Sequence, residues 1–102
     1  MNMEITIKKS QDTTLITVSG HFDTNSYTYA MDTLQPVLKD ASGRIIIDVK
    51  ELMYVSSSAL RVFLTLRKNS RSAGGTVVLR GMTEPVKQVF AMSGFLPLFI
   101  IE

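Results

Sequence analysis

The chain has 102 residues, a formal net charge of +2 and no cysteine. A chain of this length can bury a core without a disulfide or metal, so we expect a single domain over residues 1–102. The lack of cysteine excludes disulfides, thiolate nucleophiles and zinc-thiolate sites. The 11 basic and 9 acidic residues are too balanced to indicate nucleic-acid or membrane binding. With no leader-like start and no apolar run of membrane-spanning length, we expect a soluble, cytoplasmic protein.

The first part of the chain predicts a hairpin followed by a helix. Apolar and polar residues alternate over residues 3–8 and again over 14–19, with a short polar turn between them. This pattern indicates two antiparallel strands. Asp23 or Thr24 can then cap a helix, and Pro36 should interrupt that helix because proline lacks the N–H that a helix interior needs.

The rest of the chain alternates strands with helices. Continuous apolar runs at 44–49 and 76–80 are typical of strands buried on both faces, and 95–101 ends in a further short strand. Helices long enough to serve as crossovers separate these strands. The predicted order ββαβαβαβ favours an α/β domain with a mixed, mostly parallel sheet, which begins with an antiparallel hairpin and is covered by helices.

Two of these helices have clear sequence signals at their ends. From Leu60 onward, apolar residues recur at i, i+3 and i+4, which predicts an amphipathic helix headed by the serines at 56–58. The last helix should start with Thr83 as its cap and end at Gly94.

The three serines before Leu60 differ in the direction that a helix would give them. Ser56 falls toward the apolar side, where an N-cap hydroxyl accepts a backbone N–H. Ser57 and Ser58 fall on the opposite side, next to Arg61, so we expect two exposed hydroxyls. Free N–H groups and the helix dipole favour negative charge at this end. Arg61 lies where the dipole disfavours a cation, so it faces either solvent or an anionic partner. All three could equally be ordinary helix-start serines.

Enzymatic and metal sites have weak support. His21 is the single histidine, no Gly-x-Ser-x-Gly elbow surrounds Ser57, and His21 is better explained as a loop residue. Asp23 and Asp48 lie near predicted strand ends and could hold Mg²⁺, but a helix cap and a strand exit explain them as well. We therefore expect a binding protein that is not an enzyme and has no cofactor or metal.

Nucleic-acid binding would use the basic residues of the helix after Leu60. These residues lie on more than one helical face, and Tyr27 and Tyr54 fall in mostly apolar positions. The basic residues are Arg61, Arg67, Lys68 and Arg71. We expect no direct nucleic-acid contact.

The whole pattern resembles the STAS domain, the fold shared by anti-sigma factor antagonists and the cytoplasmic tails of sulphate transporters. The matching stretches are residues 18–23, 45–49, 55–60 and 86–96, in this order and spacing. The resemblance covers nearly the full chain, from about residue 3 to 101. It implies a STAS-like fold and the function of an anti-sigma factor antagonist.

In anti-sigma factor antagonists of this family, the turn before the helix commonly reads Asp-Ser-Ser-Gly-Leu, and the partner anti-sigma factor phosphorylates the first serine. Aligned on Leu60, Ser57 takes that position, Ser56 replaces the aspartate and Ala59 replaces the glycine. The resemblance implies Ser57 as the phosphorylation site. The residues that it implies in partner contacts are Asp23, Thr24, Ser56, Ser58 and Arg61.

The implied partner is an anti-sigma factor that is a serine kinase and uses ATP, and a phosphoserine phosphatase would reverse the modification. Phosphorylation adds about −1.5 to −2 charges, which a helix start tolerates but an interface fitted to a neutral hydroxyl does not. The unmodified chain would bind the kinase and free a sigma factor, and the modified chain would release the kinase. We expect a monomer or a weak dimer.

A second hypothesis is a STAS subunit that is not phosphorylated and acts as a scaffold in a sensory or transport assembly. Ser56 favours it, because the carboxylate that the family places beside the acceptor hydroxyl is replaced. Co-purification with partners that is indifferent to ATP would distinguish the scaffold from the partner switch.

Overall fold

The computed structural model describes residues 3–102, and its sheet begins with the predicted hairpin. Strands β1 (Met3–Ser10) and β2 (Thr13–Phe22) pair antiparallel along their length. Buried and more exposed residues alternate along both strands, because successive side chains point to opposite faces of a sheet. The turn between the strands is shorter than predicted, and Gln11 in it has a positive φ of 53°.

Strand β2 also continues beyond its predicted end at residue 19. Gly20 has a φ of 91°, and the pairing register shifts between Gly20 and His21, so the strand passes through an irregularity and then resumes. The expectation that His21 lies in a loop is therefore wrong, because His21 is an exposed residue of β2. Phe22, which is 1% exposed, anchors the end of the strand in the core.

The helical segment after β2 is interrupted at Pro36, as predicted. A short 3-10 turn η1 (Thr24–Ser26) leads into α1 (Tyr27–Thr33), and α2 (Gln35–Lys39) begins anew with Pro36 in its first turn. Proline fits there because the first turn of a helix has no intrahelical partner for its N–H groups.

The middle of the sheet is parallel. Strands β3 (Arg44–Asp48) and β5 (Thr76–Arg80) pair with each other, and β6 (Ile100–Ile101) pairs with β5 at the edge. The strand order is β1-β2-β3-β5-β6, with β1 alone antiparallel to its neighbour. Ile45, Ile47 and Leu79 on one face are 0% exposed, and Ile46 and Val78 on the other face are 6% and 2% exposed, which agrees with strands buried on both faces.

A further strand, β4 (Leu52–Val55), was not predicted. It pairs parallel with the end of β2, with Phe22 opposite Val55, while β3 pairs with the beginning of β2. Its burial runs buried, exposed, exposed, buried, which matches neither alternation nor a continuous apolar core run. One long strand thus has two parallel neighbours, one after the other.

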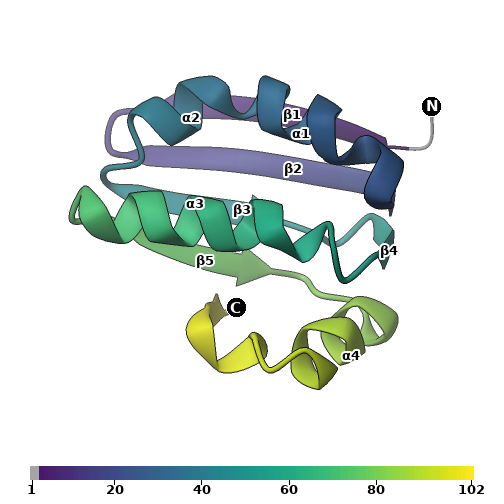
Figure 1. Ribbon diagram of the computed structural model, residues 1–102. Helices are drawn as coiled ribbons and strands as arrows, with labels where there is room; N and C mark the ends of the chain where they lie inside the picture. The colour runs from purple at the N-terminus through teal and green to yellow at the C-terminus, as the bar shows by residue number, and fades with distance from the viewer. Residues whose placement is uncertain (1–2) are drawn as a thin grey trace.

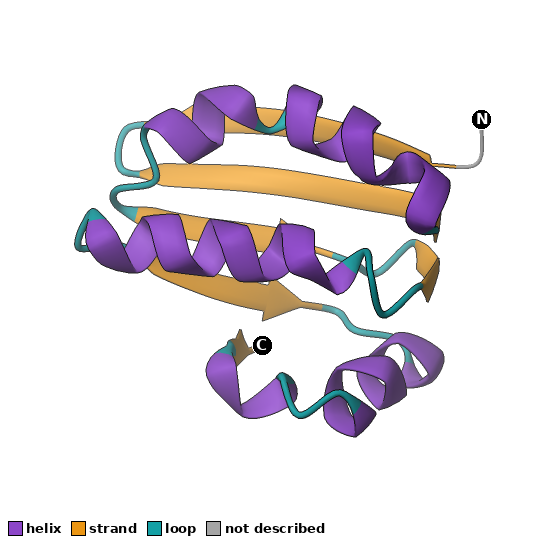
Figure 2. Cartoon of the chain, viewed as in Figure 1, coloured by secondary structure: helices purple, strands orange, loops and turns teal. Residues whose placement is uncertain are grey.

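Helices α1, α2 and α3 (Leu60–Ser72) lie over one face of the sheet (Figure 1). Helix α4 (Glu84–Met92) packs near β4, and the 3-10 turn η2 (Leu96–Leu98) leads back to the edge strand (Figure 2). Four phenylalanines connect these layers, with ring centroids 5.7, 5.4 and 5.7 Å apart from Phe22 through Phe63 and Phe90 to Phe99. These separations are typical of favourable aromatic pairs.

The predicted α/β fold class is confirmed, with an antiparallel hairpin and an otherwise parallel sheet. In the described part of the chain, no helix has the length and apolar character to cross a bilayer. The longest, α3, has 13 residues, whereas a span takes about 20.

Candidate functional site

The serine turn, residues 56–59, is positioned by the parallel pair β2 and β4. Parallel strands end at the same edge of a sheet, so the chain leaving β4 meets the chain leaving β2. The Ser56 N–H donates to the Phe22 carbonyl oxygen at 2.9 Å, which extends the pairing by one residue. The residues after Phe22 therefore lie beside the serines.

Ser56 holds the turn together. Its Oγ accepts a hydrogen bond from the Ala59 N–H at 3.1 Å, and its carbonyl oxygen accepts one from the Leu60 N–H at 3.3 Å. The predicted acceptance of a backbone N–H by the Ser56 hydroxyl is confirmed, but the N-cap of α3 is Ala59, so this bond stabilises the turn before the helix. Helix α3 itself begins at Leu60, so the serines form the turn that precedes the helix.

Ser58 is not the exposed hydroxyl that the helical pattern predicts. It is half-buried, and its Oγ lies 2.6 Å from Thr24 Oγ1 and 3.2 Å from Ser56 Oγ, in hydrogen bonds where either oxygen can donate. The expectation of two exposed hydroxyls is wrong here because Thr24, which follows β2, occupies the space beside Ser58. A helical projection of residues 56–72 alone does not show contacts with residues from another segment, such as Thr24.

Ser57 is exposed, as predicted, and its side chain forms no hydrogen bond within residues 3–102. Arg61 is also exposed, and the described part of the chain offers its guanidinium no carboxylate partner. The turn therefore presents one free hydroxyl and, one helical turn later, one unpaired positive charge.

The two aspartates considered for metal binding are engaged within the fold. Asp23 Oδ1 accepts hydrogen bonds from the Ser26 N–H at 3.1 Å and the Ser26 hydroxyl at 3.0 Å, which caps η1. Asp48 Oδ1 accepts the Lys50 N–H at 3.0 Å. Among residues 3–102, no group of three metal-binding side chains gathers at one place.

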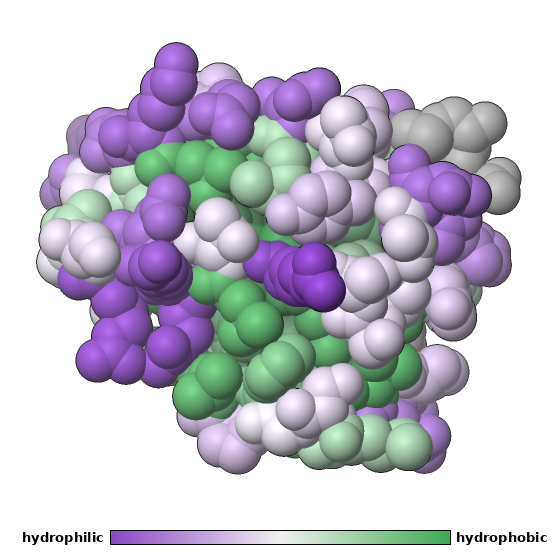
Figure 3. Space-filling view, viewed as in Figure 1, coloured by the Kyte–Doolittle hydropathy of each residue, from purple (hydrophilic) through white to green (hydrophobic). Residues whose placement is uncertain are grey.

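A hollow of about 250 Å³ opens beside the turn, between α1 and α3. Thr24, Tyr27, Thr28, Ser58 and Arg61 line it. Arg61 and Tyr27 also line a second hollow of similar size, which extends along α3 toward Lys68. The surface next to the serines is thus concave, rich in hydroxyls and positively charged. Figure 3 shows this helical face, on which hydrophilic and hydrophobic residues are interspersed.

Sequence analysis missed two exposed apolar residues beside the turn. Met53 and Tyr54 on β4 are 50% and 47% exposed. The Tyr54 ring lies 6.2 Å from the His21 ring of β2, centroid to centroid. Large apolar residues just before the serines are visible in the sequence. Their exposure could be predicted only if residues 52–55 were identified as a strand, because the strand β4 turns Met53 and Tyr54 outward.

Comparison with known proteins assigns this arrangement to a family. A sequence profile of the STAS domain matches residues 4–102. The chain belongs to the STAS domain family. The resemblance based on residues 18–23, 45–49, 55–60 and 86–96 is thereby confirmed, over almost the full chain.

Two curated relatives of this STAS domain are bacterial regulators. The chain is 41% identical over 56 residues to BtrV of Bordetella bronchiseptica, which is named provisionally as an anti-sigma factor antagonist. That match covers 55% of this chain and 48% of BtrV, about half of that relative's length. The chain is also 24% identical over 94 residues to the anti-sigma-B factor antagonist of Bacillus subtilis, which covers 92% of this chain and 85% of the relative.

Solved structures share the fold. The anti-sigma factor antagonist SpoIIAA in its unphosphorylated form superposes with a TM-score of 0.80 at 18% identity, over 97% of this chain and 88% of that one. The phosphorylated form of SpoIIAA from Bacillus gives a TM-score of 0.73 at 17% identity, over 97% and 91%. TM1081 of Thermotoga maritima gives 0.82 at 17% identity, over 95% and 84%.

Proposed function

We propose that this STAS domain is an anti-sigma factor antagonist that is controlled by phosphorylation of Ser57. Unphosphorylated, it binds an anti-sigma factor that is also a serine kinase, and this binding frees a sigma factor. The phosphorylated form releases the kinase, and a phosphoserine phosphatase restores binding. The chain itself is a binding protein that performs no catalysis.

The observation that carries this proposal is the difference between Ser57 and its neighbours. Ser56 and Ser58 are engaged in hydrogen bonds, whereas Ser57 is exposed and unengaged. A kinase can reach this one hydroxyl without unfolding the turn. Phosphate there adds about −1.5 to −2 charges to solvent-facing surface, so the fold should persist while the partner's surface meets a new charge.

The surroundings of Ser57 support a protein partner. Met53 and Tyr54 expose apolar surface on one side of the turn, and Arg61 exposes a charge on the other. Aromatic and arginine side chains are frequent energetic centres of interfaces. Asp23 and Thr24, which lie beside the turn, complete this proposed contact surface together with Ser56 and Ser58.

The names of the relatives support the same function. BtrV and the Bacillus subtilis relative are both named as anti-sigma factor antagonists. SpoIIAA is an anti-sigma factor antagonist for which both an unphosphorylated and a phosphorylated form have been solved.

The test is incubation of the purified chain with its cognate kinase and ATP, followed by mass spectrometry. We expect one phosphate on Ser57, none on the Ser57→Ala variant, and unchanged phosphorylation at Ser57 in Ser58→Ala. Phosphate on no serine of the turn, in the presence of a kinase shown to be active, contradicts the proposal.

The scaffold function remains the second candidate because Ser56 stands where anti-sigma factor antagonists commonly have aspartate. A constitutive scaffold would co-purify with its partners to the same extent with and without ATP. A partner switch would lose its kinase after ATP is added and would keep it when Ser57→Ala replaces the native chain.

A further inference from the structure

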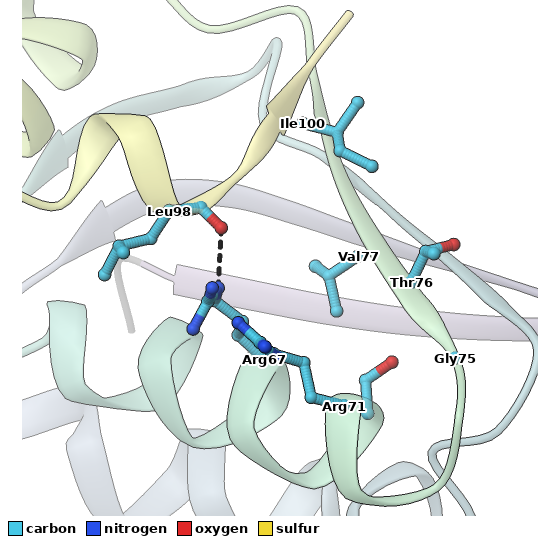
Figure 4. Close-up of a pocket in the computed structure, with 8 residues that line it drawn as sticks. Arg67, Arg71, Gly75, Thr76, Val77, Leu98 and Ile100 are labelled. Atoms are coloured by element: carbon cyan, nitrogen blue, oxygen red, sulfur yellow. Dashed lines mark hydrogen bonds between the residues drawn. The ribbon is translucent and has the colours of Figure 1, made fainter.

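A separate pocket lies at the opposite end of α3 from the serine turn. It has a volume of about 270 Å³ and is bounded by α3, the start of β5 and the segment that leads into β6 (Figure 4). Arg67 and Arg71 of α3 form one side, and Val77, Leu98 and Ile100 form an apolar wall.

The two arginines give the pocket an uncompensated positive charge. Within residues 3–102, neither Arg67 nor Arg71 forms an ion pair with a carboxylate. Arg67 Nε donates to the Leu98 carbonyl oxygen at 2.6 Å, which fixes the guanidinium at the pocket and leaves its terminal N–H groups without a protein acceptor in the described chain. Two guanidinium groups at one small pocket are stabilised by an anion between them.

Ser70 adds a buried, unpartnered hydroxyl to the residues around this pocket. It lines the pocket, its side chain is 0% exposed, and its hydroxyl has no hydrogen-bond partner among the residues described. Buried hydroxyls without a partner are uncommon in folded proteins. Gly75 lies next to it, since a Cβ at position 75 would be 2.8 Å from Ser70 Oγ.

We propose that this pocket binds a small organic carboxylate. The carboxylate lies against Arg67 and Arg71, whose planar guanidinium groups match it, and a short aliphatic chain lies against Val77, Leu98 and Ile100. The volume of about 270 Å³ lies just below the usual range of small-molecule pockets, roughly 300–1,000 Å³, so it fits a short-chain acid better than a nucleotide.

The test is an NMR titration of the full chain with hexanoate as the probe, followed by amide chemical shifts. We expect saturable shifts at residues 75–77 and 98–100. Hexylammonium has the same chain length and the opposite charge, so it should cause no saturable shift there. Inorganic phosphate lacks the aliphatic part and should bind more weakly than hexanoate.

Arg71→Gln is the informative variant, because the Arg71 side chain forms no hydrogen bond or ion pair within the described chain that the substitution would break. It should weaken hexanoate binding about tenfold, the effect of losing one charge-assisted hydrogen bond. Lys68→Gln is the matched control: it removes one positive charge from the same helix but lines the hollow near Arg61. It should change hexanoate affinity by less than about twofold.

Three results would overturn the proposal. The first is the absence of saturable hexanoate shifts at these residues, and the second is phosphate or hexylammonium binding as tightly as hexanoate. The third is an equal loss of affinity in Lys68→Gln and Arg71→Gln, which would indicate general charge attraction. None of these results bears on the phosphorylation of Ser57, so the two proposals stand or fall separately.

Discussion

The three adjacent serines of the turn differ in what their hydroxyls contact. Ser56 caps a backbone N–H inside the turn, and Ser58 bonds to Thr24 across to the end of β2. The Ser57 hydroxyl takes part in neither of these hydrogen bonds. A turn in which two hydroxyls are structural and one is free can change the chemistry of the free one at little cost to the fold.

Ser56→Ala should therefore destabilise the domain. The variant loses the hydrogen bond to the Ala59 N–H, a capping interaction worth about 1 kcal/mol. For a domain of this size, that loss lowers the thermal midpoint by roughly 4–8 °C in a calorimetric scan. Ser57→Ala is the control, and its midpoint should stay close to that of the native chain. Equal midpoints for the two variants would contradict the capping role.

Ser57→Asp should separate binding from stability. The added carboxylate imitates part of the phosphate charge, so binding to the kinase partner should weaken by about tenfold or more. The thermal midpoint should stay within a few degrees, because Ser57 is exposed. Binding is measured by calorimetric titration and the midpoint by thermal melting. If the variant unfolds, the tolerance of charge at this position is refuted.

At the scale of the element, β2 is the strand that determines where the serines lie. Its end pairs with β4 through the register shift at Gly20 and His21, and Gly20 adopts a φ of 91° there. A side chain disfavours this conformation, since left-handed backbone costs a non-glycine residue about 1–2 kcal/mol. The position of the serine turn thus depends on the backbone conformation of Gly20, which lies on the neighbouring strand β2 and pairs with Leu52 of β4.

Gly20→Ala should reduce both stability and partner binding. The strain falls on the β2–β4 pairing, so the serine turn shifts relative to Asp23 and Thr24. Gly94→Ala is the matched control, because Gly94 also has a positive φ, of 79°, but ends α4 with no atom within 4 Å of an added Cβ. Both variants should melt earlier, and only Gly20→Ala should bind the partner more weakly. Equal binding by the two would show that the register shift has no role in positioning the turn.

At the scale of the whole molecule, three segments are tied across the face of the sheet that the helices leave uncovered. Arg44 of β3 and Arg80 of β5 both bind the carboxylate of Glu102, at 2.7 and 2.6 Å. Ile46 and Val78 lie on this same face by strand alternation, and they are only 6% and 2% exposed. Burial thus extends to the face that α1, α2 and α3 leave uncovered.

This tie predicts a pH-dependent stability. The hydrogen bond from Arg80, followed by the charges of Arg80 and Arg44, lowers the pKa of Glu102 below its ordinary value. A carboxyl with a lowered folded-state pKa stabilises the fold above the ordinary pKa of about 4.3, and the contribution is lost as the pH falls through the folded-state pKa.

The measurement is the thermal midpoint of the native chain and of Glu102→Gln over a range of pH. The native chain should melt later at pH 7, and the difference should shrink as the pH falls below about 4. Glu4→Gln is the control, because Glu4 is exposed and no ion pair of the described chain includes it. A constant difference for Glu102→Gln at every pH would rule out a contribution from its charge.

Sequence reasoning succeeded wherever one segment's own pattern determines its structure. Alternation identified the hairpin, continuous apolar runs identified β3 and β5, and Pro36 marked the break between α1 and α2. The exposed Ser57 and the capping Ser56 also follow from local geometry.

Features that depend on contacts between distant segments could not be predicted in this way. Strand β4 has four residues without a strand-like pattern, and it pairs with the part of β2 that continues beyond the end of β3. The burial of Ser58 depends on Thr24, and Thr83 directs its hydroxyl to the Leu52 carbonyl oxygen at 3.3 Å in place of the predicted cap. The pocket at Arg71 requires the return of the chain at Leu98 and Ile100.

The tandem pairing of β2 also limits how this domain can vary in length. Deleting one residue of β2 between Thr17 and Gly20 would leave the pairing of residues 13–17 with β3 unchanged. The residues of β2 that pair with β4 would then exchange their inward-facing and outward-facing side chains. A substitution in the serine turn causes no such inversion, because it leaves the number of residues in each strand unchanged. Insertions and deletions in relatives should therefore be rare within β2 and more common in the loops at the far ends of the helices, even where the turn itself has diverged.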